Sequence, residues 1–325
     1  MDISSIIQQL KDSDLRCETE SRNTISRLNL NNRQIGEKAF KDLAQVLKDN
    51  TSLQILYLSN NRIGDNGAQD IAQALSRNTS LRQLDLNGNQ IGDEGAREIA
   101  KVLTCNTSLQ VLGLGYNQIG YIGSQAIGGA LKNNSSLQQL FLDDNHIGDQ
   151  GAQAIAQALK KNTALQNLYL GSNHIGVEGA TEIAKVLTCN TSLQHLNLSD
   201  NQIGDEGAQA IAQALKVNRS LQSLDLGGNH IGKDGAEVIS KVLRYNTSLR
   251  YLYLYLNQIK NIGSKFLINM LSINYSILKV TIFKKDIDEL YVQKLDSLLN
   301  TNIDPTSNSY QDKIRKRKVY FNLIL

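Results

Sequence analysis

The sequence has few of the residues that stabilise small secreted proteins or span membranes. Among its 325 residues are three cysteines, Cys17, Cys105 and Cys189, too few for a disulfide framework. No apolar run reaches the ~18 residues of a membrane-spanning helix, and the first residues lack the basic and apolar segments of a secretory signal. These absences favour a cytoplasmic protein, and delivery into a host cell stays open as an alternative.

Net charge is scarce outside the C-terminal end. The whole chain has a formal charge of +3, and residues 301–325 alone carry five basic and two acidic residues, so the rest of the chain sums to zero. A phosphate backbone requires a concentrated basic surface. We therefore expect no nucleic-acid partner.

One segment dominates the chain: Leu-x-x-Leu-x-Leu-x-x-Asn-x-Ile-Gly, repeated with a period of 28 residues. Its first apolar position is found at Ile25, Leu53, Leu81, Leu109, Leu137, Leu165, Leu193, Leu221, Leu249 and Ile277. A fixed period of this length indicates one supersecondary unit stacked on copies of itself. Since such an array has no single core that stops growing, we predict one long domain.

Each copy combines a strand pattern with a helix pattern. In the copy that begins at Leu53, alternation predicts a short strand with Leu56 and Leu58 facing inward and Tyr57 facing outward. Residues 68–75 then place apolar side chains at i, i+3, i+4 and i+7, which predicts a helix packed on the strands. Because helices are wider than strands spaced about 4.8 Å apart, the array is expected to curve with its strands inside.

Polar residues recur at fixed positions of the repeat. An amide that follows the strand can donate and accept hydrogen bonds within a buried turn, which predicts a structural ladder of Asn61, Asn89, Asn117, Asn145, Asn173, Asn201, Asn229 and Asn257. Four aspartates are expected to cap the helix of their own repeat: Asp65, Asp93, Asp149 and Asp205. Asn-x-Ser/Thr segments also recur at one position, which indicates a turn rather than glycosylation.

The repeat resembles the ribonuclease-inhibitor-like class of leucine-rich repeats, found in cytosolic ribonuclease inhibitor and in NOD-like receptors. The resemblance covers residues 25 to about 287. It implies an α/β fold, a right-handed leucine-rich-repeat solenoid (horseshoe) with a concave parallel β-sheet and convex α-helices. It leaves the function open, because that class binds many unrelated proteins. No nucleotide-binding domain precedes the repeats, so we do not expect an entire NOD-like receptor.

The pattern weakens toward both ends. Arg33 and Lys285 replace the ladder asparagine in the first and last copies, and Lys260 replaces the turn glycine in the ninth. We predict four segments: an N-terminal cap (1–24), nine leucine-rich repeats (25–276), a degenerate last repeat with a C-terminal capping helix (277–300), and a basic, partly flexible tail (301–325). The tail is open to four interpretations: nuclear import, membrane contact, partner binding, or packing on the last repeat.

The residue types that commonly bind metals or act in catalysis form no recognisable site in this sequence. His146, His174 and His230 share one position, which other copies fill with glutamine and which we interpret as a solvent-facing turn. No carboxylate or cysteine at ligand spacing accompanies these histidines, so we predict no metal. The repeat does not bring any nucleophilic side chain next to a general base. We therefore predict no catalytic residue, no cofactor and no enzymatic activity.

The outward strand positions vary between copies and hold the candidate partner-binding residues. In the ninth strand, tyrosine and leucine alternate from Tyr251 to Leu256, which predicts three rings on the concave side. Exposed tyrosine is a common anchor for a protein partner, although the tail could cover the rings or the rings could pack on one another. The predicted partner-binding residues are Tyr251, Tyr253, Tyr255, Tyr169, Phe141, Tyr57, Asp85, Asp225 and Asp200.

We therefore predict a non-catalytic recognition module that binds a protein on its concave face, in a host-interacting, signalling or scaffold role. The alternative is a GTPase-activating regulator of the Ran type, which uses the same repeat class. Members of that family typically carry an acidic C-terminal region, whereas this tail is basic. No arginine stands out at the concave rim as a charge-stabilising group, although Arg27 and Arg62 are available. We expect a monomer whose partner the sequence does not identify.

Overall fold

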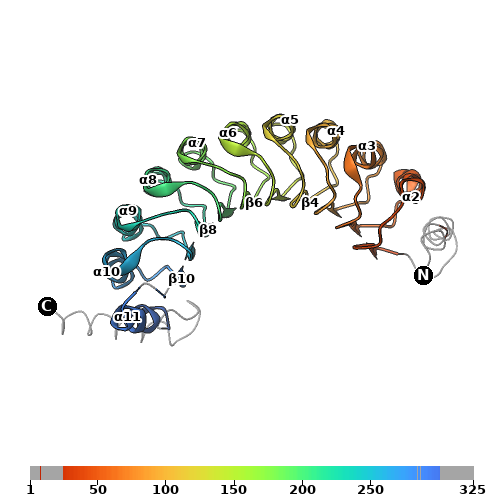
Figure 1. Ribbon diagram of the computed structural model, residues 1–325. Helices are drawn as coiled ribbons and strands as arrows, with labels where there is room; N and C mark the ends of the chain where they lie inside the picture. Colours follow the sequence, from red (N-terminus) through yellow and green to blue (C-terminus); the bar gives the residue numbers. More distant parts are fainter. Residues whose placement is uncertain (1–7, 9–24, 284, 286, 301–325) are drawn as a thin grey trace, which may run out of the picture. The chain divides into compact units, whose positions relative to one another are not determined.

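Helices and strands alternate along the chain with the period of the sequence repeat (Figure 1). The computed structural model describes residue 8 and residues 25–283, 285 and 287–300, and all structural statements below concern these residues. The predicted tail at 301–325 and, apart from residue 8, the predicted cap at 1–24 lie outside them. Contacts divide the chain into two units, Met1–Asn173 and His174–Leu325, which we describe separately.

The first unit alternates three-residue strands with helices. Its strands are β1 (Arg27–Asn29), β2 (Ile55–Tyr57), β3 (Gln83–Asp85), β4 (Val111–Gly113), β5 (Gln139–Phe141) and β6 (Asn167–Tyr169). Its helices are α2 (Glu37–Asp49), α3 (Gly64–Leu75), α4 (Asp93–Leu103), α5 (Tyr121–Leu131) and α6 (Gly148–Leu159).

The second unit continues the same alternation. Its strands are β7 (His195–Asn197), β8 (Ser223–Asp225), β9 (Tyr251–Leu254) and β10 (Lys279–Ile282). Its helices are α7 (Val177–Leu187), α8 (Gly204–Leu215), α9 (Lys233–Leu243), α10 (Lys260–Leu271) and α11 (Glu289–Asn300). The last helix, α11, packs against α10.

Neighbouring strands within each unit pair in parallel and in register with the repeat. Leu56 lies opposite Leu84 in the first unit, and Leu224 lies opposite Leu252 in the second. These leucines are almost completely buried, because the side chains of a strand alternate between its two faces and the leucines face the helices. Residues such as Tyr57 and Asp225, which follow them, are left on the opposite face.

The helices cover the leucine-bearing side of the strands. In each unit the strands lie on the inner side and the helices on the outer side (Figure 1). Helix α3 buries Ala68, Ile71, Ala72 and Leu75 as one stripe, in agreement with the helical period of the sequence. Both units therefore have the α/β leucine-rich-repeat solenoid fold that the sequence predicts. None of the described helices combines the length and the apolar character needed to cross a bilayer.

The expected capping role of the aspartates is wrong in one respect. The N-caps of α3, α4, α6 and α8 carry no side-chain cap hydrogen bond, so none of the four aspartates caps its own helix. Asp65 Oδ1 instead accepts from the backbone N–H groups of Gly92 and Gly95, at 2.7 and 3.0 Å, in the next repeat. Asp93 and Asp205 make the same two contacts one repeat further on. These carboxylates therefore cap the following helix and link consecutive repeats.

Candidate functional site

Buried asparagines hold the turns that follow the strands. Asn145 is 1% exposed, and its Nδ2 donates to the carbonyl oxygens of Leu114, Leu142 and Asp143 at 2.9, 3.0 and 3.2 Å. Its Oδ1 accepts from the backbone N–H of Ile119 at 2.9 Å. Since Leu114 and Ile119 belong to the preceding repeat, one side chain joins two repeats. The other ladder asparagines also donate to backbone carbonyl oxygens: Asn61, Asn89, Asn117, Asn173, Asn201, Asn229 and Asn257.

A second asparagine ladder lies at the other end of the repeat. Asn78 Nδ2 donates to the carbonyl oxygens of Leu47 and Asn50 at 2.7 and 2.8 Å, and its Oδ1 accepts from the N–H of Leu81 at 2.8 Å. Equivalent buried asparagines are Asn50, Asn106, Asn134, Asn162, Asn190, Asn218, Asn246 and Asn274. All of these asparagines except Asn162 begin an Asn-x-Ser/Thr pattern, which predicts a turn but not the burial of the amide. Both ladders fix the strands whose outward side chains form the candidate surface.

In the first unit, four outward residues lie in register across β3 to β6: Asp85, Gly113, Phe141 and Tyr169. The rings of Phe141 and Tyr169 stack face to face, with centroids 4.3 Å apart and planes inclined by 7°. Asp85 accepts from the hydroxyl of Ser59 at 2.6 Å and from the N–H of Asn87 at 3.0 Å. The sequence prediction placed these side chains on one face but did not include their stacking.

Tyr57 lies on β2 of the same unit and contacts Arg27 of β1. The guanidinium carbon of Arg27 lies 5.0 Å from the centre of the Tyr57 ring, and Arg27 Nη2 donates to the Tyr57 hydroxyl at 3.0 Å. Arg27 was one of two candidate arginines for the GTPase-activating alternative. In this structure it covers part of a ring that the sequence assigns to partner binding.

In the second unit, Tyr251 and Tyr253 lie partly exposed on β9, while Leu252 and Leu254 between and beyond them are fully buried. The Nζ of Lys279, on β10, lies 5.3 Å from the centre of the Tyr253 ring. Tyrosine side chains that face away from the core in this way present both ring surface and hydroxyl to a partner.

Tyr255 does not lie on the strand with Tyr251 and Tyr253, as the alternation in the sequence predicts, because β9 ends at Leu254. A Cβ atom on Gly227 would lie 2.4 Å from the ring of Tyr255, so this ring occupies the space that Gly227 leaves free. The Tyr255 hydroxyl donates to Asp225 Oδ2 at 3.3 Å. Leu256 has φ of 50° and is 56% exposed, so the alternation predicted to run to Leu256 stops before it. The Tyr255 ring packs across the neighbouring repeat.

Two aspartates accompany these tyrosines. Asp225 Oδ1 accepts from the N–H of Gly227 at 2.8 Å, and burial is the main cause that raises the pKa of Asp225, with the charge of Asp200 adding to it. Burial likewise raises the pKa of Tyr253 and of Tyr255, and the Asp225 charge adds to both shifts. Asp200 is exposed, with φ of 53°. The cluster is therefore partly desolvated and negatively charged.

The structure places the predicted residues in two groups, one in each unit. The first-unit group contains Tyr57, Asp85, Phe141 and Tyr169, and the second-unit group contains Asp200, Asp225, Tyr251, Tyr253 and Tyr255. Over the described part of the chain, no three His, Cys, Asp or Glu side chains come together as metal ligands.

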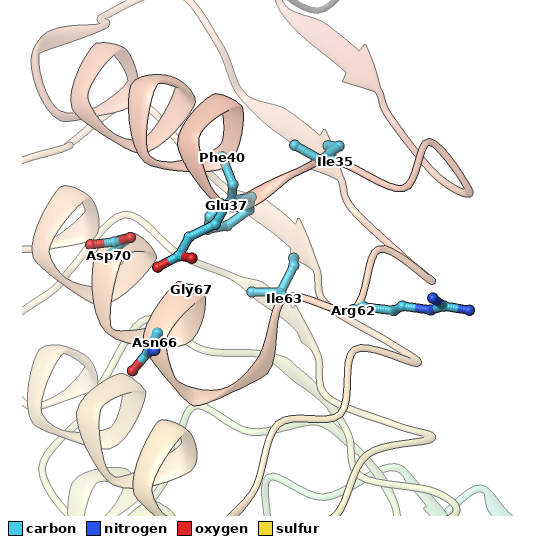
Figure 2. Close-up of a pocket in the computed structure, with 8 residues that line it drawn as sticks. All are labelled: Ile35, Glu37, Phe40, Arg62, Ile63, Asn66, Gly67 and Asp70. Carbon is cyan, nitrogen blue, oxygen red and sulfur yellow. The ribbon is translucent and has the colours of Figure 1, made fainter.

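In the first unit, a pocket of about 180 Å³ lies between the beginnings of α2 and α3, and none of the predicted partner-binding residues lines it. Figure 2 shows Ile35, Phe40 and Ile63 around it, with Arg62 extending away from the other residues that line it. Phe40 stands at the position where the next repeat has Ala68. Phe40 is buried and forms part of the lining of this pocket.

Comparisons with known proteins agree with the fold. A family model described as "TMOD/LMOD Leucine-rich domain" matches residues 1–126 and 175–289, and a second, described as "Leucine Rich repeat", matches residues 133–156 and 161–184. No curated protein matches this chain.

Two solved structures match about half of this chain at low identity. One, "Leiomodin-1 Actin-Binding Site 2 (ABS2)", is 21% identical with a TM-score of 0.43, over 51% of this chain and 93% of that one. The other, a tropomodulin C-terminal domain from Caenorhabditis elegans, is 17% identical with a TM-score of 0.42, over 50% of this chain and 93% of that one. The more specific likeness to ribonuclease inhibitor and NOD-like receptors stays a prediction. Because the first family model matches more than half of the chain, this protein belongs to the TMOD/LMOD leucine-rich domain family of leucine-rich-repeat proteins.

Proposed function

We propose that this protein is a non-catalytic recognition module that binds a protein partner through the strand face opposite its helices. The observation that carries the proposal is the arrangement on β9. Leu252 and Leu254 supply the core, while Tyr251 and Tyr253 are partly exposed and are not required to fill it. Partly exposed aromatic side chains on a rigid sheet are typical anchors of protein interfaces.

The rigidity of that face supports the same proposal. Asn229 and Asn257 donate to backbone carbonyl oxygens on both sides of the turns next to β8 and β9. A surface held by buried hydrogen bonds loses little conformational entropy when a partner binds. Binding energy from the tyrosines is then available for affinity.

We also propose a cytoplasmic location and a monomeric state. Cys105 and Cys189 are free, exposed thiols, and exposed unpaired thiols are typical of a reducing compartment. A signalling or scaffold role, including one toward a host protein, fits a recognition module without chemistry of its own.

Site-specific photo-crosslinking tests the binding face. A benzophenone amino acid would replace Tyr251 in one variant and Gln73, on the exposed side of α3, in a second. We expect crosslinks to a partner protein from position 251 and none to that protein from position 73. Purified actin, which the leiomodin-1 structure is described as binding, serves as one defined probe. Crosslinks from position 73 alone would contradict the proposed face.

A further inference from the structure

Exposed apolar side chains recur at one position of the repeat in the second unit. Val217, Tyr245 and Ile273 lie two residues after the ends of α8, α9 and α10, and they are 58%, 79% and 41% exposed. Single exposed apolar residues are common on protein surfaces. Because α9 packs against both α8 and α10, and packed helices lie about 8–10 Å apart, these three side chains form one row.

The helices of the first unit end differently. The corresponding turns after α3 to α6 carry mainly polar residues: Arg77, Cys105, Asn133 and Lys161. A second outward position, one helical turn or more earlier, changes in the same direction, because Val238 of α9 stands where α6 has Ala154. The added apolar surface is therefore a feature of the second unit and not of the repeat in general.

A groove lies beside this row, between the neighbouring helices α8 and α9 (Figure 1). Its volume is about 540 Å³, within the range of about 300–1,000 Å³ that is usual for ligand sites. Val238 and Val242 of α9 line the hollow, and Tyr245 stands exposed at the C-terminal end of that helix. Gln213 and Lys216 line it from α8. The groove therefore has one mainly apolar wall and one polar wall.

The charged residues next to the groove are basic. Residues 210–219 and 238–247, which end α8 and α9, contain no acidic residue and four basic ones: Lys216, Arg219, Lys241 and Arg244. Lys241 pairs with Glu237, one turn earlier on α9, at 2.6 Å. Lys216 and Arg244 are exposed, and neither forms an ion pair with another described residue. Both can therefore pair with a carboxylate of a partner.

Helix stability explains the basic residues but not the apolar ones. Lys216 and Arg244 are the C-caps of α8 and α9, where the helix dipole favours positive charge. Lys160, the C-cap of α6 in the first unit, has the same position but is followed by a second lysine. The dipole does not favour an exposed valine or tyrosine after the cap. An apolar surface with a charged rim is instead typical of an interaction site.

A partner that fits this surface has apolar side chains on one face and acidic side chains beside them. An amphipathic helix places its apolar side chains at i, i+3, i+4 and i+7 and lays them in a groove. A bilayer instead receives apolar side chains that protrude from a protein, whereas Val238 and Val242 lie in a hollow. The hollow therefore favours a helix, whose own side chains can enter it.

We propose that the groove between α8 and α9 binds an acidic amphipathic helix of a protein partner. Apolar side chains of that helix contact Val238, Val242 and Tyr245, and its carboxylates pair with Lys216 and Arg244. This surface lies on the helices of the second unit, so the proposal goes beyond the function proposed above, which concerns the strand face.

Binding of three labelled, designed peptides to the full chain tests the groove. The acidic peptide has leucine or phenylalanine at i, i+4, i+7 and i+11 and glutamate or glutamine elsewhere. A basic peptide has lysine in place of each glutamate, and a scrambled acidic peptide has the same composition without an apolar face. By fluorescence anisotropy we expect the acidic amphipathic peptide to bind at least fivefold more tightly than either of the others.

A tyrosine variant tests the apolar contact. Tyr245→Ala should weaken binding of the acidic amphipathic peptide at least fivefold, and because this side chain is 79% exposed, the fold should persist, as circular dichroism would verify. Tyr121→Ala is the matched control. It removes a tyrosine that is 51% exposed on α5 of the first unit, and it should bind the peptide like the parent.

Two double variants test the charge contact. Lys216→Gln, Arg244→Gln should weaken the acidic amphipathic peptide at least fivefold. Lys132→Gln, Lys160→Gln removes the same charge from the C-caps of α5 and α6 and should bind it like the parent. The proposal is overturned if the acidic amphipathic peptide does not bind, if the basic or scrambled peptide binds as tightly, or if either groove variant binds like the parent. Vesicles of phosphatidylserine and phosphatidylcholine that bind the parent but not Tyr245→Ala, without peptide binding, would assign the surface to a membrane and would equally overturn it.

Discussion

The carboxylate of Asp93 accepts a hydrogen bond from the backbone N–H of Gly120, in the next repeat, at 2.7 Å. Gly120 has φ of −94°, whereas Gly148, at the same position one repeat later, has φ of 60°. Asp93 stands 27 positions before Gly120, whereas the residue at the same distance before Gly148 is Tyr121. The Gly148 N–H donates instead to the carbonyl oxygen of Asn173 at 2.9 Å.

Other repeats show the same association between an aspartate contact and a negative φ of the turn glycine. Gly92 and Gly232 accompany an aspartate contact and have φ of −97° and −99°. Gly64 and Gly204, for which the preceding repeat has Glu37 and Val177, have φ of 62°. We infer that an aspartate at this position of one repeat sets the turn conformation of the following repeat, whereas the glutamate Glu37 does not.

Asp93→Ala should therefore destabilise the helix of the next repeat, α5, rather than its own. The substitution removes the acceptor of the Gly120 and Gly123 N–H groups, and loss of such a cap costs about 1–2 kcal/mol. Amide exchange at Gly120 and Gly123 should become faster. Glu94→Ala is the control, because Glu94 is 67% exposed and forms a surface ion pair with Arg97, at 3.4 Å, within its own helix. Equal exchange in the two variants would contradict the cap assignment.

Two adjacent glycines of α5 should respond to alanine in opposite directions. A Cβ on Gly128 would lie 2.8 Å from the carbonyl oxygen of Ala154 in α6, whereas a Cβ on Gly129 would meet nothing within 4 Å. Gly129→Ala should raise the free energy of unfolding by about 0.5–1 kcal/mol, because alanine restricts the unfolded chain. Gly128→Ala should lower it by about 1–3 kcal/mol through overpacking. Urea denaturation measures both, and a stabilising Gly128→Ala would show that α5 and α6 are less closely packed.

The two asparagine ladders should contribute similarly to stability. Asn145→Ala leaves the carbonyl oxygen of Leu114 and the N–H of Ile119 without this partner, and should cost about 1–3 kcal/mol. Asn134→Ala, in the second ladder, removes the donor to Leu103 and the acceptor of the Leu137 N–H, and should cost about the same. Thermal unfolding compares the two variants. Parent-like melting of either one would exclude a structural role for that ladder.

The ionised carboxylate of Asp225 should lower the free energy of unfolding at neutral pH. Burial raises its pKa above the value in the unfolded chain, so folding is favoured when it is protonated and this contribution is lost as the pH rises through the folded-state pKa. Asp225→Asn keeps an oxygen acceptor for Gly227 and Tyr255 without the charge. The gain in Tm over the parent should be larger at pH 7.5 than at pH 4. Asp225→Ala, which has no acceptor, should melt below Asp225→Asn at both pH values.

The period and the inward leucines were sufficient to predict the fold, because burial of Leu56 and its equivalents requires the strand and helix layers to stack. Contacts between repeats were not predictable in the same way. The sequence shows Asp65 at the start of a helix, but only the structure shows that the nearest free N–H groups belong to Gly92 and Gly95. The position of the Tyr255 ring depends on the absence of a side chain at Gly227, which is distant in sequence.

The affinity of a Tyr251→Ala, Tyr253→Ala double variant for a crosslinked partner tests the central claim most directly. Both side chains face away from the core, so the variant should fold with unchanged helix content. We expect its Kd to rise at least tenfold, which corresponds to about 1.4 kcal/mol. A Gln73→Ala, Arg77→Ala variant, which changes exposed residues on α3 and just after its end, should bind like the parent. Normal binding by the tyrosine variant, together with loss of binding by the α3 variant, would contradict recognition through the strand face.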